Sequence, residues 1–506
     1  MPSQDSQFSQ TPKTLYQKII DYIWPIERHE LPKFLSITLL MFCILFIQNL
    51  IRAQKDSIVN TMIGTETISF LKFWGVLPAS ILMTVLYVKL VNIMKAEHIF
   101  YLILSVFLLF FAIFGFVLFP YHETFHLHPE STAAWVAHYP HFKWFILLFS
   151  KWSFSLFYII AELWPNAVFA ILFWQFVNNV TSVGESKRFY LLFGMFGQTG
   201  LYFSGAFLEN VPAISNHIIA TYNLELTRSV LAVELTTAIV LVLGLAALAT
   251  FWSLNHQILD TQAAEIKFTV AKKKGLSMME SFRMIASSRY IMLIAVLLMC
   301  YGAAINLVEQ PWKAKATLVY TTNEEYLAFV GKYLSYTGIA TIAFAVLGSN
   351  IVRRIGWFAA AIITPIMLFS TGMLFFAISN FENISGFVIT SLALSDPAVI
   401  AVTIGMITQV LSKSSKYTLF DATKEMAYVP LDSELKAKGK GAVDSIGIKL
   451  GKSSSSLLQF MIFMIIPTAT YQSISGYLMV IFTVICIIWI WAVRELGLEY
   501  KNKTAS

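Results

Sequence analysis

The chain has 506 residues, of which 57% are hydrophobic and 13% carry a charge, and its mean hydropathy is +0.67. This composition leaves too little polar surface to cover a soluble globule, so it excludes a soluble enzyme or binding domain and indicates an integral membrane protein. The net charge of +7 does not require a nucleic-acid partner, because basic loops that face anionic lipid account for it.

The first segment of the chain is polar. Residues 1–12 form a Ser- and Gln-rich tail without the apolar core of a signal peptide, and residues 11–33 form an amphipathic stretch that we expect at the membrane interface. Apolar runs then recur with about the 20 residues that cross a hydrocarbon core of about 30 Å as a helix. Twelve spans are predicted, at 34–56, 66–91, 98–120, 142–180, 187–208, 229–253, 289–312, 325–352, 357–379, 396–428, 446–469 and 474–494.

Two predicted spans are too long for one straight crossing. The span 142–180 is interrupted by Trp164-Pro165 and the span 396–428 by Ser412–Lys416, so each is expected to be a broken helix or a helix that extends beyond the bilayer. We keep 142–180 as a single span, because dividing it would give thirteen spans.

Basic residues indicate how the chain is oriented. Residues 254–288 form a polar linker that contains Lys272-Lys-Lys274, and the excess of Lys and Arg in this and other loops on the same side places it in the cytoplasm. Both termini, including the tail 495–506, are then cytoplasmic.

The two halves of the chain repeat one another. The charged ends of the first and seventh spans hold Lys55 and Glu309, and glycines at Gly197 and Gly451 open the fifth and eleventh spans, each pair about 254 residues apart. Two parallel six-helix halves, 34–253 and 289–494, predict an all-α, major-facilitator-like architecture with the substrate site between the halves near the midplane.

Charged residues within the spans are the candidates for function, because a charge at the bilayer centre costs at least about 2.5–3.5 kcal/mol. Lysines outnumber carboxylates among them, which suits a polyanionic substrate, and the carboxylates can pair with the lysines when no substrate is present. The alternative is that individual lysines reach the membrane interface or form structural ion pairs. Phosphate binding is assigned to Lys55, Lys452, Lys416 and Lys440, and coupling or gating to Glu162, Glu309, Asp56 and Asp421.

The segment from Gly447 to Ser453 resembles a phosphate-binding P-loop, but Ile446 stands where that motif requires glycine. No acidic Walker B strand follows it, so we expect neither ATP hydrolysis nor another enzymatic activity. The glycines are interpreted as sites where helices pack closely, since small residues let membrane helices approach one another.

Three aromatic residues near Glu162 are candidates for stacking on a nucleotide base, namely Tyr158, Trp164 and Phe157. The alternative for each is packing in the protein core. The three cysteines lie in apolar runs, and the histidines of the loop after residue 120 lack the spacing of helical metal ligands, so no metal and no cofactor are expected.

Several motifs extend over nearly the whole chain. They are Ile23-Trp-Pro-Ile26, Tyr158-Ile-Ile-Ala-Glu162-Leu-Trp164, Asn306-Leu-Val-Glu309, Ser412-Lys-Ser-Ser-Lys-Tyr417, Asp421-Ala-Thr-Lys-Glu-Met-Ala-Tyr428 and Lys438-Gly-Lys440. Together they resemble the ATP/ADP translocase family of plastids and obligate intracellular bacteria. The resemblance implies twelve helices, an inner-membrane location and transport of nucleotides, such as import of ATP against ADP.

The family residues that matter for transport fall on Lys55, Glu162, Glu309 and Lys452. The chain departs from the pattern of the energy-exchanging members at Gln54, Pro165 and Ser454-Ser455. Relatives of this kind include proton-coupled importers of several nucleoside triphosphates (GTP, UTP, CTP and ATP) and a carrier of NAD, and these remain alternatives, as does transport of another organic phosphate. The expected partners are a nucleotide, phosphate or a proton as the coupled ion, and the lipid bilayer, with a monomer as the functional unit.

Overall fold

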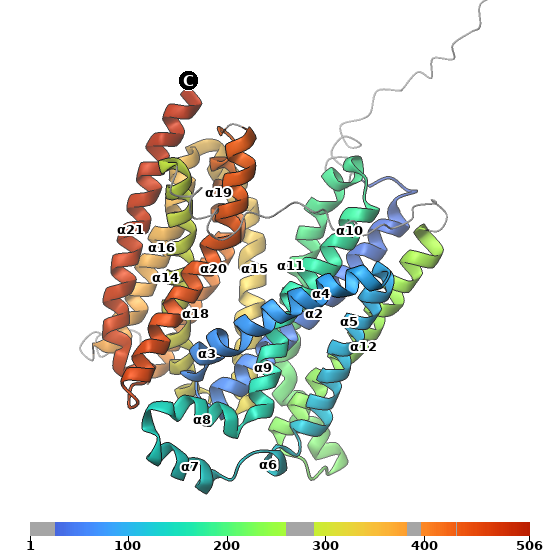
Figure 1. Ribbon diagram of the computed structural model, residues 1–506, viewed down its shortest axis with the longest axis vertical. Helices are drawn as coiled ribbons and strands as arrows, with labels where there is room; N and C mark the ends of the chain where they lie inside the picture. Colours follow the sequence, from blue (N-terminus) through green and yellow to red (C-terminus); the bar gives the residue numbers. More distant parts are fainter. Residues whose placement is uncertain (1–25, 260–287, 382–395, 432, 506) are drawn as a thin grey trace, which may run out of the picture.

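The computed structural model describes residues 26–259, 288–381, 396–431 and 433–505, and within these ranges every regular element is helical (Figure 1). Most of the predicted tail and interfacial stretch and the basic segment Lys272–Lys274 lie outside the described residues. In lipid, helices satisfy their own backbone hydrogen bonds, which is why apolar runs of this length adopt no other regular structure.

The first half of the chain contains six crossings. They are α2 (Leu31–Met62), α3 (Thr67–Phe70) with η1 (Leu71–Val76) and α4 (Leu77–Ile93), α5 (Ala96–Ile113) with η2 (Phe114–Leu118), α9 (Trp152–Trp164) with η4 (Pro165–Phe173) and α10 (Trp174–Val180), α11 (Val183–Tyr222), and α12 (Arg228–Ser253) with η5 (Leu254–Leu259).

The second half of the chain repeats this arrangement. Its crossings are α14 (Arg289–Val319), α15 (Asn323–Ile355), α16 (Trp357–Asn380), α18 (Pro397–Ser415) with η7 (Lys416–Phe420) and α19 (Asp421–Ala427), α20 (Ser433–Ile465) and α21 (Tyr471–Ala505). Ten of these crossings are apolar enough over the described residues to span a membrane. With α11 and α20, at 40 and 33 residues, the bundle has the twelve helices that the sequence predicts.

Two predicted boundaries are corrected by local chemistry. The fifth crossing begins at Val183 rather than at 187, because Ser182 and Glu185 form a capping box in which each side chain accepts a hydrogen bond from the other residue's backbone N–H. The first crossing extends to Met62 rather than to 56, so Lys55 and Asp56 lie inside the helix and not at its edge.

The predicted start of the fourth span, residue 142, is wrong. Residues 143–150 form a separate short helix, α8, and the crossing begins at Trp152. The break at Pro165 is confirmed, and so is the interruption in the tenth span: each is a π-helical segment, η4 or η7, that leaves the crossing continuous. Proline lacks the N–H that an α-helical turn requires, which explains the local change of helix type at η4.

The halves pack by the same scheme. In the first half α2 packs against α11 and α12, and in the second half α14 packs against α20 and α21. Between the halves, α11 meets α15, while the α3–η1 segment meets α20, so the fifth crossing of each half contacts the second crossing of the other. This reciprocity supports the duplication inferred from the sequence.

The two ends of the bundle differ. We call the end that holds the C-terminal residues the terminal end, at the top of Figure 1, and the opposite end, with α6 (His122–Phe125), α7 (Pro129–His138) and α8, the loop end. In Figure 1 the halves lie close together toward the loop end, and the first half is on the right.

Polar contacts hold the halves together at the loop end. Ser57 donates a hydrogen bond to the carbonyl of Asn323 at 2.7 Å, and Asn60 donates one to the hydroxyl of Tyr326 at 3.0 Å. The carboxylate of Glu66 accepts a hydrogen bond of 3.1 Å from the first backbone N–H of α21, at Tyr471. All three contacts lie within about two turns of a helix end, so this end of the bundle is closed.

The contact between α11 and α15 lies nearer the middle of the bundle. A Cβ atom added at Gly205 would lie 2.6 Å from the carbonyl oxygen of Gly331, and one added at Gly331 would lie 2.7 Å from that of Gly205. The two helices therefore touch backbone to backbone, a distance that only glycine permits.

Candidate functional site

A chain of ion pairs lies between the two halves, and Asp56 on α2 is at its centre. One carboxylate oxygen of Asp56 lies 2.7 Å from Nζ of Lys55, and the other lies 2.8 Å from Nζ of Lys313 on α14. Lys55 and Asp56 are 3% and 6% exposed, so both charges are removed from bulk solvent. Buried charges of this kind are stable only when partnered, which the shared carboxylate achieves for two lysines at once.

On the first half, Lys55 has two further partners on α9. Its ammonium group lies 2.9 Å from Oε1 of Glu162 and 4.0 Å from the ring centre of Tyr158. Glu162 and Tyr158 are four residues apart and therefore share a helix face. The aromatic face adds a cation–π interaction to the ion pairs.

On the second half, Glu309 interacts with two lysines. Its Oε1 atom lies 3.2 Å from Nζ of Lys313, one turn along α14, and 3.8 Å from Nζ of Lys413 on α18. The ammonium group of Lys413 also lies 4.9 Å from the ring centre of Tyr333 on α15. Residues from both halves thus meet in one cluster.

Further cations surround these ion pairs. Lys72 donates a weak hydrogen bond of 3.4 Å to the side-chain oxygen of Asn306. Lys452 on α20 has a solvent-exposed side chain and lies within electrostatic reach of Glu309 and Glu162. Arg52 on α2 lies within electrostatic reach of Glu309 and Asp56 and lines a small pocket together with them.

The cluster carries an excess of positive charge. Its cations among the described residues are Arg52, Lys55, Lys72, Lys313, Lys413 and Lys452, and its carboxylates are Asp56, Glu162 and Glu309. Cations thus outnumber carboxylates two to one. A site of this composition is electrostatically incomplete without a ligand that bears several negative charges.

The structure brings together five of the predicted site residues, namely Lys55, Asp56, Glu162, Glu309 and Tyr158, and places Lys452 within electrostatic reach of them. It places the three other charged candidates, Lys416, Lys440 and Asp421, elsewhere. Lys416 pairs with Asp421 at 2.8 Å on η7 and α19, and Lys440 pairs with Glu425. These pairs lie in the parts of α18–α19 and α20 that approach the terminal end.

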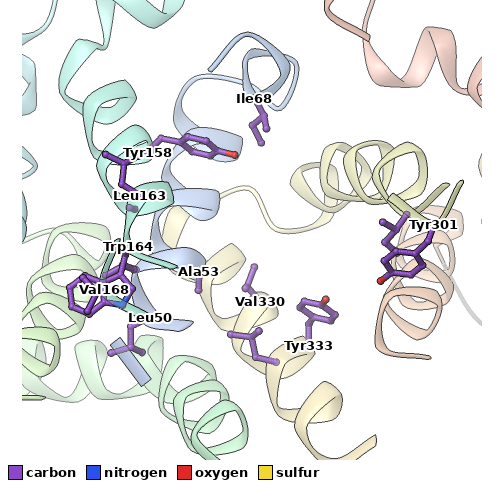
Figure 2. Close-up of a cluster of buried hydrophobic side chains, with 14 of the residues drawn as sticks. Leu50, Ala53, Ile68, Tyr158, Leu163, Trp164, Val168, Tyr301, Val330 and Tyr333 are labelled. Carbon is purple, nitrogen blue, oxygen red and sulfur yellow. The ribbon is translucent and has the colours of Figure 1, made fainter. Parts of the chain in front are cut away.

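The other two aromatic candidates lie in the packing of the first half. Trp164 is fully buried and donates a hydrogen bond of 3.2 Å to the backbone carbonyl of Ile44. Figure 2 shows Trp164 beside Val168 and Leu50, on the far side of Ala53 from Tyr333. Phe157 is stacked on Phe114, with ring centres 3.9 Å apart.

Sequence reasoning missed Arg52 and Lys413 as site residues. Helical spacing was the available signal: Arg52 lies one turn before Asp56, and Lys413 lies about one turn before Lys416 in a span already singled out for its polar interruption. Lys313 and Lys72 also lie within apolar spans, but nothing in their spacing from Lys55 indicates contact between the two halves.

The glycine-rich segment before Lys452 lies within the continuous helix α20. A Cβ atom at Gly451 would lie 2.1 Å from the carbonyl oxygen of Met299, and one at Gly447 would lie 2.9 Å from Cβ of Leu298. The interpretation of these glycines as sites of close helix packing is therefore confirmed. The packing seats Lys452 against α14, the helix that carries Glu309.

Solved structures support the fold. A bacterial homologue of the iron transporter ferroportin in an inward-facing state has a TM-score of 0.56 at 11% identity, with 93% of this chain and 99% of that chain covered. A point mutant of the nucleoside transporter NupG has a TM-score of 0.54 at 11% identity, with 92% of this chain and 99% of that chain covered. A D-xylose–proton symporter has a TM-score of 0.53 at 12% identity, with 92% of this chain and 97% of that chain covered. At these identities the likeness concerns the fold alone, which is that of major-facilitator-like transporters.

Comparison of sequences is more specific. The chain is 63% identical to ADP,ATP carrier protein 4 of Rickettsia bellii over 488 residues, 96% of this chain and 94% of that protein. It is 62% identical to ADP,ATP carrier protein 4 of Rickettsia prowazekii, with 96% of this chain and 95% of that protein covered. It is 43% identical to ADP,ATP carrier protein 3 of Rickettsia bellii, with 97% of this chain and 99% of that protein covered. The family model described as TLC ATP/ADP transporter matches residues 9–500. This multi-pass membrane protein therefore belongs to the TLC ATP/ADP transporter family.

Proposed function

We propose that the chain is a secondary transporter of nucleotides that exchanges ATP for ADP across the inner membrane by alternating access of its two halves. The observation that carries this proposal is the excess of cations in the cluster between the halves. Several ammonium groups and one guanidinium can neutralise the phosphates of a nucleotide, and they lie within membrane-spanning helices, where a buried charge is costly unless it has a function.

The closed loop end supports one particular state of the transport cycle. If both termini lie in the cytoplasm, the loop end faces outward, and the site is closed to the outside and accessible from the cytoplasm. The exposed side chain of Lys452, on the terminal side of the Asp56–Lys313 pair, fits this arrangement.

Asp56 supports an exchange mechanism. It joins Lys313 of one half to Lys55 of the other, so a phosphate that binds these lysines would compete with the contact that holds the halves together. Without an anion, the lysines would lose their partners on separation of the halves, and the empty carrier would be prevented from reorienting. Phosphate is the coupled ion that this mechanism accommodates.

Proton-coupled net import of nucleoside triphosphates is the second candidate function. Glu162 favours it, because the side chain of this carboxylate is 30% exposed and its ion pair is with Lys55. Protonation of Glu162 would remove one of the two carboxylates that pair with Lys55 and leave Asp56 as the other, so a proton would loosen this part of the cluster without a substrate anion.

Uptake of labelled nucleotides into proteoliposomes tests both candidates. With internal ADP, exchange predicts rapid entry of ATP, and without internal ADP almost none; an uncoupler changes neither. Proton-coupled import predicts entry without internal ADP that the uncoupler abolishes. Competition by ATP, ADP, GTP, UTP, CTP and NAD then gives the base preference, and failure of every nucleotide to enter would refute the proposal.

Matched variants connect uptake to the cluster. Lys55→Gln is expected to reduce uptake by at least about tenfold, since loss of a charge-assisted contact to phosphate is worth about 1.5–3 kcal/mol. Lys332→Gln is the control, because Lys332 is an exposed lysine on α15 that contacts the ring of Tyr336 at 5.9 Å. Equal uptake by the two variants would contradict the assignment of Lys55.

A further inference from the structure

The pocket beside the ion-pair cluster is lined mainly by charged and aromatic side chains. It is lined by Arg52 and Asp56 from α2, Glu309 and Lys313 from α14, Tyr333 from α15 and Lys413 from α18. Three cations face two carboxylates there. The pocket belongs to both halves, since α2 is in the first half and the other three helices are in the second.

Arg52 is the unusual member of this pocket. It forms no hydrogen bond and no ion pair with any residue in the described part of the chain, although it lies within electrostatic reach of Asp56 and Glu309. The two oxygens of Asp56 are taken by Lys55 and Lys313, and Oε1 of Glu309 is shared by Lys313 and Lys413. The five N–H donors of the partly buried guanidinium group thus have no acceptor among the described residues and are available to a ligand in the pocket.

Tyr333 supplies a second, independent observation. Its side chain is 5% exposed, and its hydroxyl is buried without a hydrogen-bond partner among the described residues. An unsatisfied buried hydroxyl costs about 1–3 kcal/mol, so a hydroxyl in a pocket wall indicates that a ligand completes its hydrogen bonding. The ring of Tyr333 also contacts Lys413 at 4.9 Å, which places the hydroxyl-bearing side chain beside a cation.

The chemistry of these groups selects a phosphoryl group. A guanidinium fork binds two oxygens of a phosphate at once, a lysine adds a point charge, and a phenol donates to a third oxygen. Glu309 lies 3.8 Å from Lys413, which is long for an ion pair, so a doubly charged phosphate can displace it from this lysine.

We propose that Arg52, Lys413 and Tyr333 form an anion subsite that receives a phosphoryl group, distinct from the Lys55–Glu162 part of the cluster. This inference rests on the proposed transport of nucleotides and specifies where one phosphate binds. The phosphoryl group comes either from the end of the nucleotide's phosphate chain or from inorganic phosphate, and both sources present the same tetrahedral oxygens.

Binding to the purified full-length protein tests the subsite. Dissociation constants of ATP, ADP, AMP and inorganic phosphate are measured for the wild type, Arg52→Gln and Tyr333→Phe. Arg228→Gln and Tyr336→Phe are the matched controls, because both side chains are exposed and lie outside the pocket. Arg52→Gln is expected to raise the Kd of the recognised anion at least about tenfold, and Tyr333→Phe about threefold.

The two sources give different patterns. If the subsite binds the end of the nucleotide's phosphate chain, Arg52→Gln weakens the binding of ATP and ADP strongly and the binding of AMP by less than about threefold. If it takes inorganic phosphate, the Kd of phosphate rises and the Kd values of the nucleotides do not. Unchanged Kd values for all four ligands in both variants would overturn the proposal.

Unfolding without ligand separates a binding role from a structural role. Arg52 has no hydrogen-bond or ion-pair partner among the described residues, so Arg52→Gln is expected to leave the unfolding temperature of the ligand-free protein unchanged or to raise it. The further increase in unfolding temperature on addition of ATP or phosphate is expected to be smaller for this variant than for the wild type. A structural arginine would give the opposite result. If Arg52→Gln does not fold, the proposal is refuted for Arg52, and Tyr333→Phe, which removes one oxygen, tests the pocket alone.

Failure of the proposed function is recognised separately. A wild-type protein that binds none of the nucleotides refutes nucleotide transport, whereas the phosphate measurement still decides the subsite. If the wild type binds nucleotides, and both nucleotides and phosphate bind equally tightly to the wild type and to the Arg52→Gln and Tyr333→Phe variants, the proposed function stands and the subsite is refuted.

Discussion

At the scale of single residues, Asp56 is the junction of the site. It is 6% exposed and holds lysines from both halves, one on each oxygen. The sequence predicts Asp56 and Lys55 as charges of functional interest, because charges within apolar spans are rare, and the structure brings the two together in one cluster. It did not predict Lys313 as the partner, since contact between residues on different halves depends on how the halves dock and leaves no periodic signal.

Asp56→Asn is expected to lower the free energy of unfolding by about 3–5 kcal/mol, because it leaves two buried lysines with fewer partners. Thermal unfolding in detergent measures this change. The control is Asp421→Asn, whose ion pair with Lys416 is more exposed and is worth about 0–1 kcal/mol. Equal losses of stability in the two variants would contradict the role of Asp56 as the carboxylate that pairs with lysines of both halves.

His126 in the loop between α6 and α7 predicts a pH dependence. Burial, together with the nearby positive charges of His122 and Lys151, lowers the pKa of His126 to about 4. Its Nε2 atom shares a hydrogen bond of 2.7 Å with the hydroxyl of Ser153 at the start of α9.

Because the folded-state pKa of His126 lies below the unfolded value of about 6.5, the folded state binds this proton less well than the unfolded state. The contribution to stability is therefore complete above pH 6.5 and is lost as the pH falls toward 4. Unfolding temperatures measured across this range are expected to fall more steeply for the wild type than for His126→Gln. Parallel curves would contradict the assignment.

At the scale of elements, glycines determine how closely the helices pack. The sequence predicted this role for Gly451, because a glycine next to a lysine in an apolar helix had no phosphate-loop context. It also predicted interruptions at Pro165 and at Ser412–Lys416. It could not predict that both would be π-helical, since the helix type depends on which neighbouring side chains take up the extra residue.

Gly451→Ala is expected to destabilise the protein by at least about 2 kcal/mol, because the added Cβ would overlap the backbone of α14 at Met299. Gly476→Ala on α21 is the matched control. Nothing lies within 4 Å of a Cβ at Gly476, so alanine there is expected to be neutral or to stabilise the helix by up to about 1 kcal/mol. Chemical or thermal unfolding of both variants measures the difference, and equal destabilisation by the two would contradict the close packing at Gly451.

At the scale of the whole molecule, the duplication visible in the sequence predicted the architecture, because each half repeats the same charged and glycine-bearing segments. The sequence carried no information about which end of the bundle is closed. That depends on single polar contacts such as Ser57 with Asn323 and Asn60 with Tyr326, whose residues are ordinary on a helix surface.

The closed loop end predicts the side from which the site can be reached. The native cysteines, Cys43, Cys300 and Cys486, are all buried, so a single introduced cysteine can be followed with a membrane-impermeant thiol reagent. Lys452→Cys is expected to react from the terminal side only and more slowly with ATP present. Glu123→Cys, at the exposed loop end, should react from the other side. Reaction of Lys452→Cys from the loop side would contradict the closed state.

The backbone contact of Gly205 with Gly331 bears on how fast the carrier can turn over. The atoms nearest to these two glycines are mostly backbone, and the side chains of Ser335 and Leu208 pack beside them, so α11 and α15 are held at a short, fixed separation at this crossing. Reorientation of the two halves is then expected to pivot at this crossing, while the polar contacts at the loop end and the Asp56–Lys313 ion pair break.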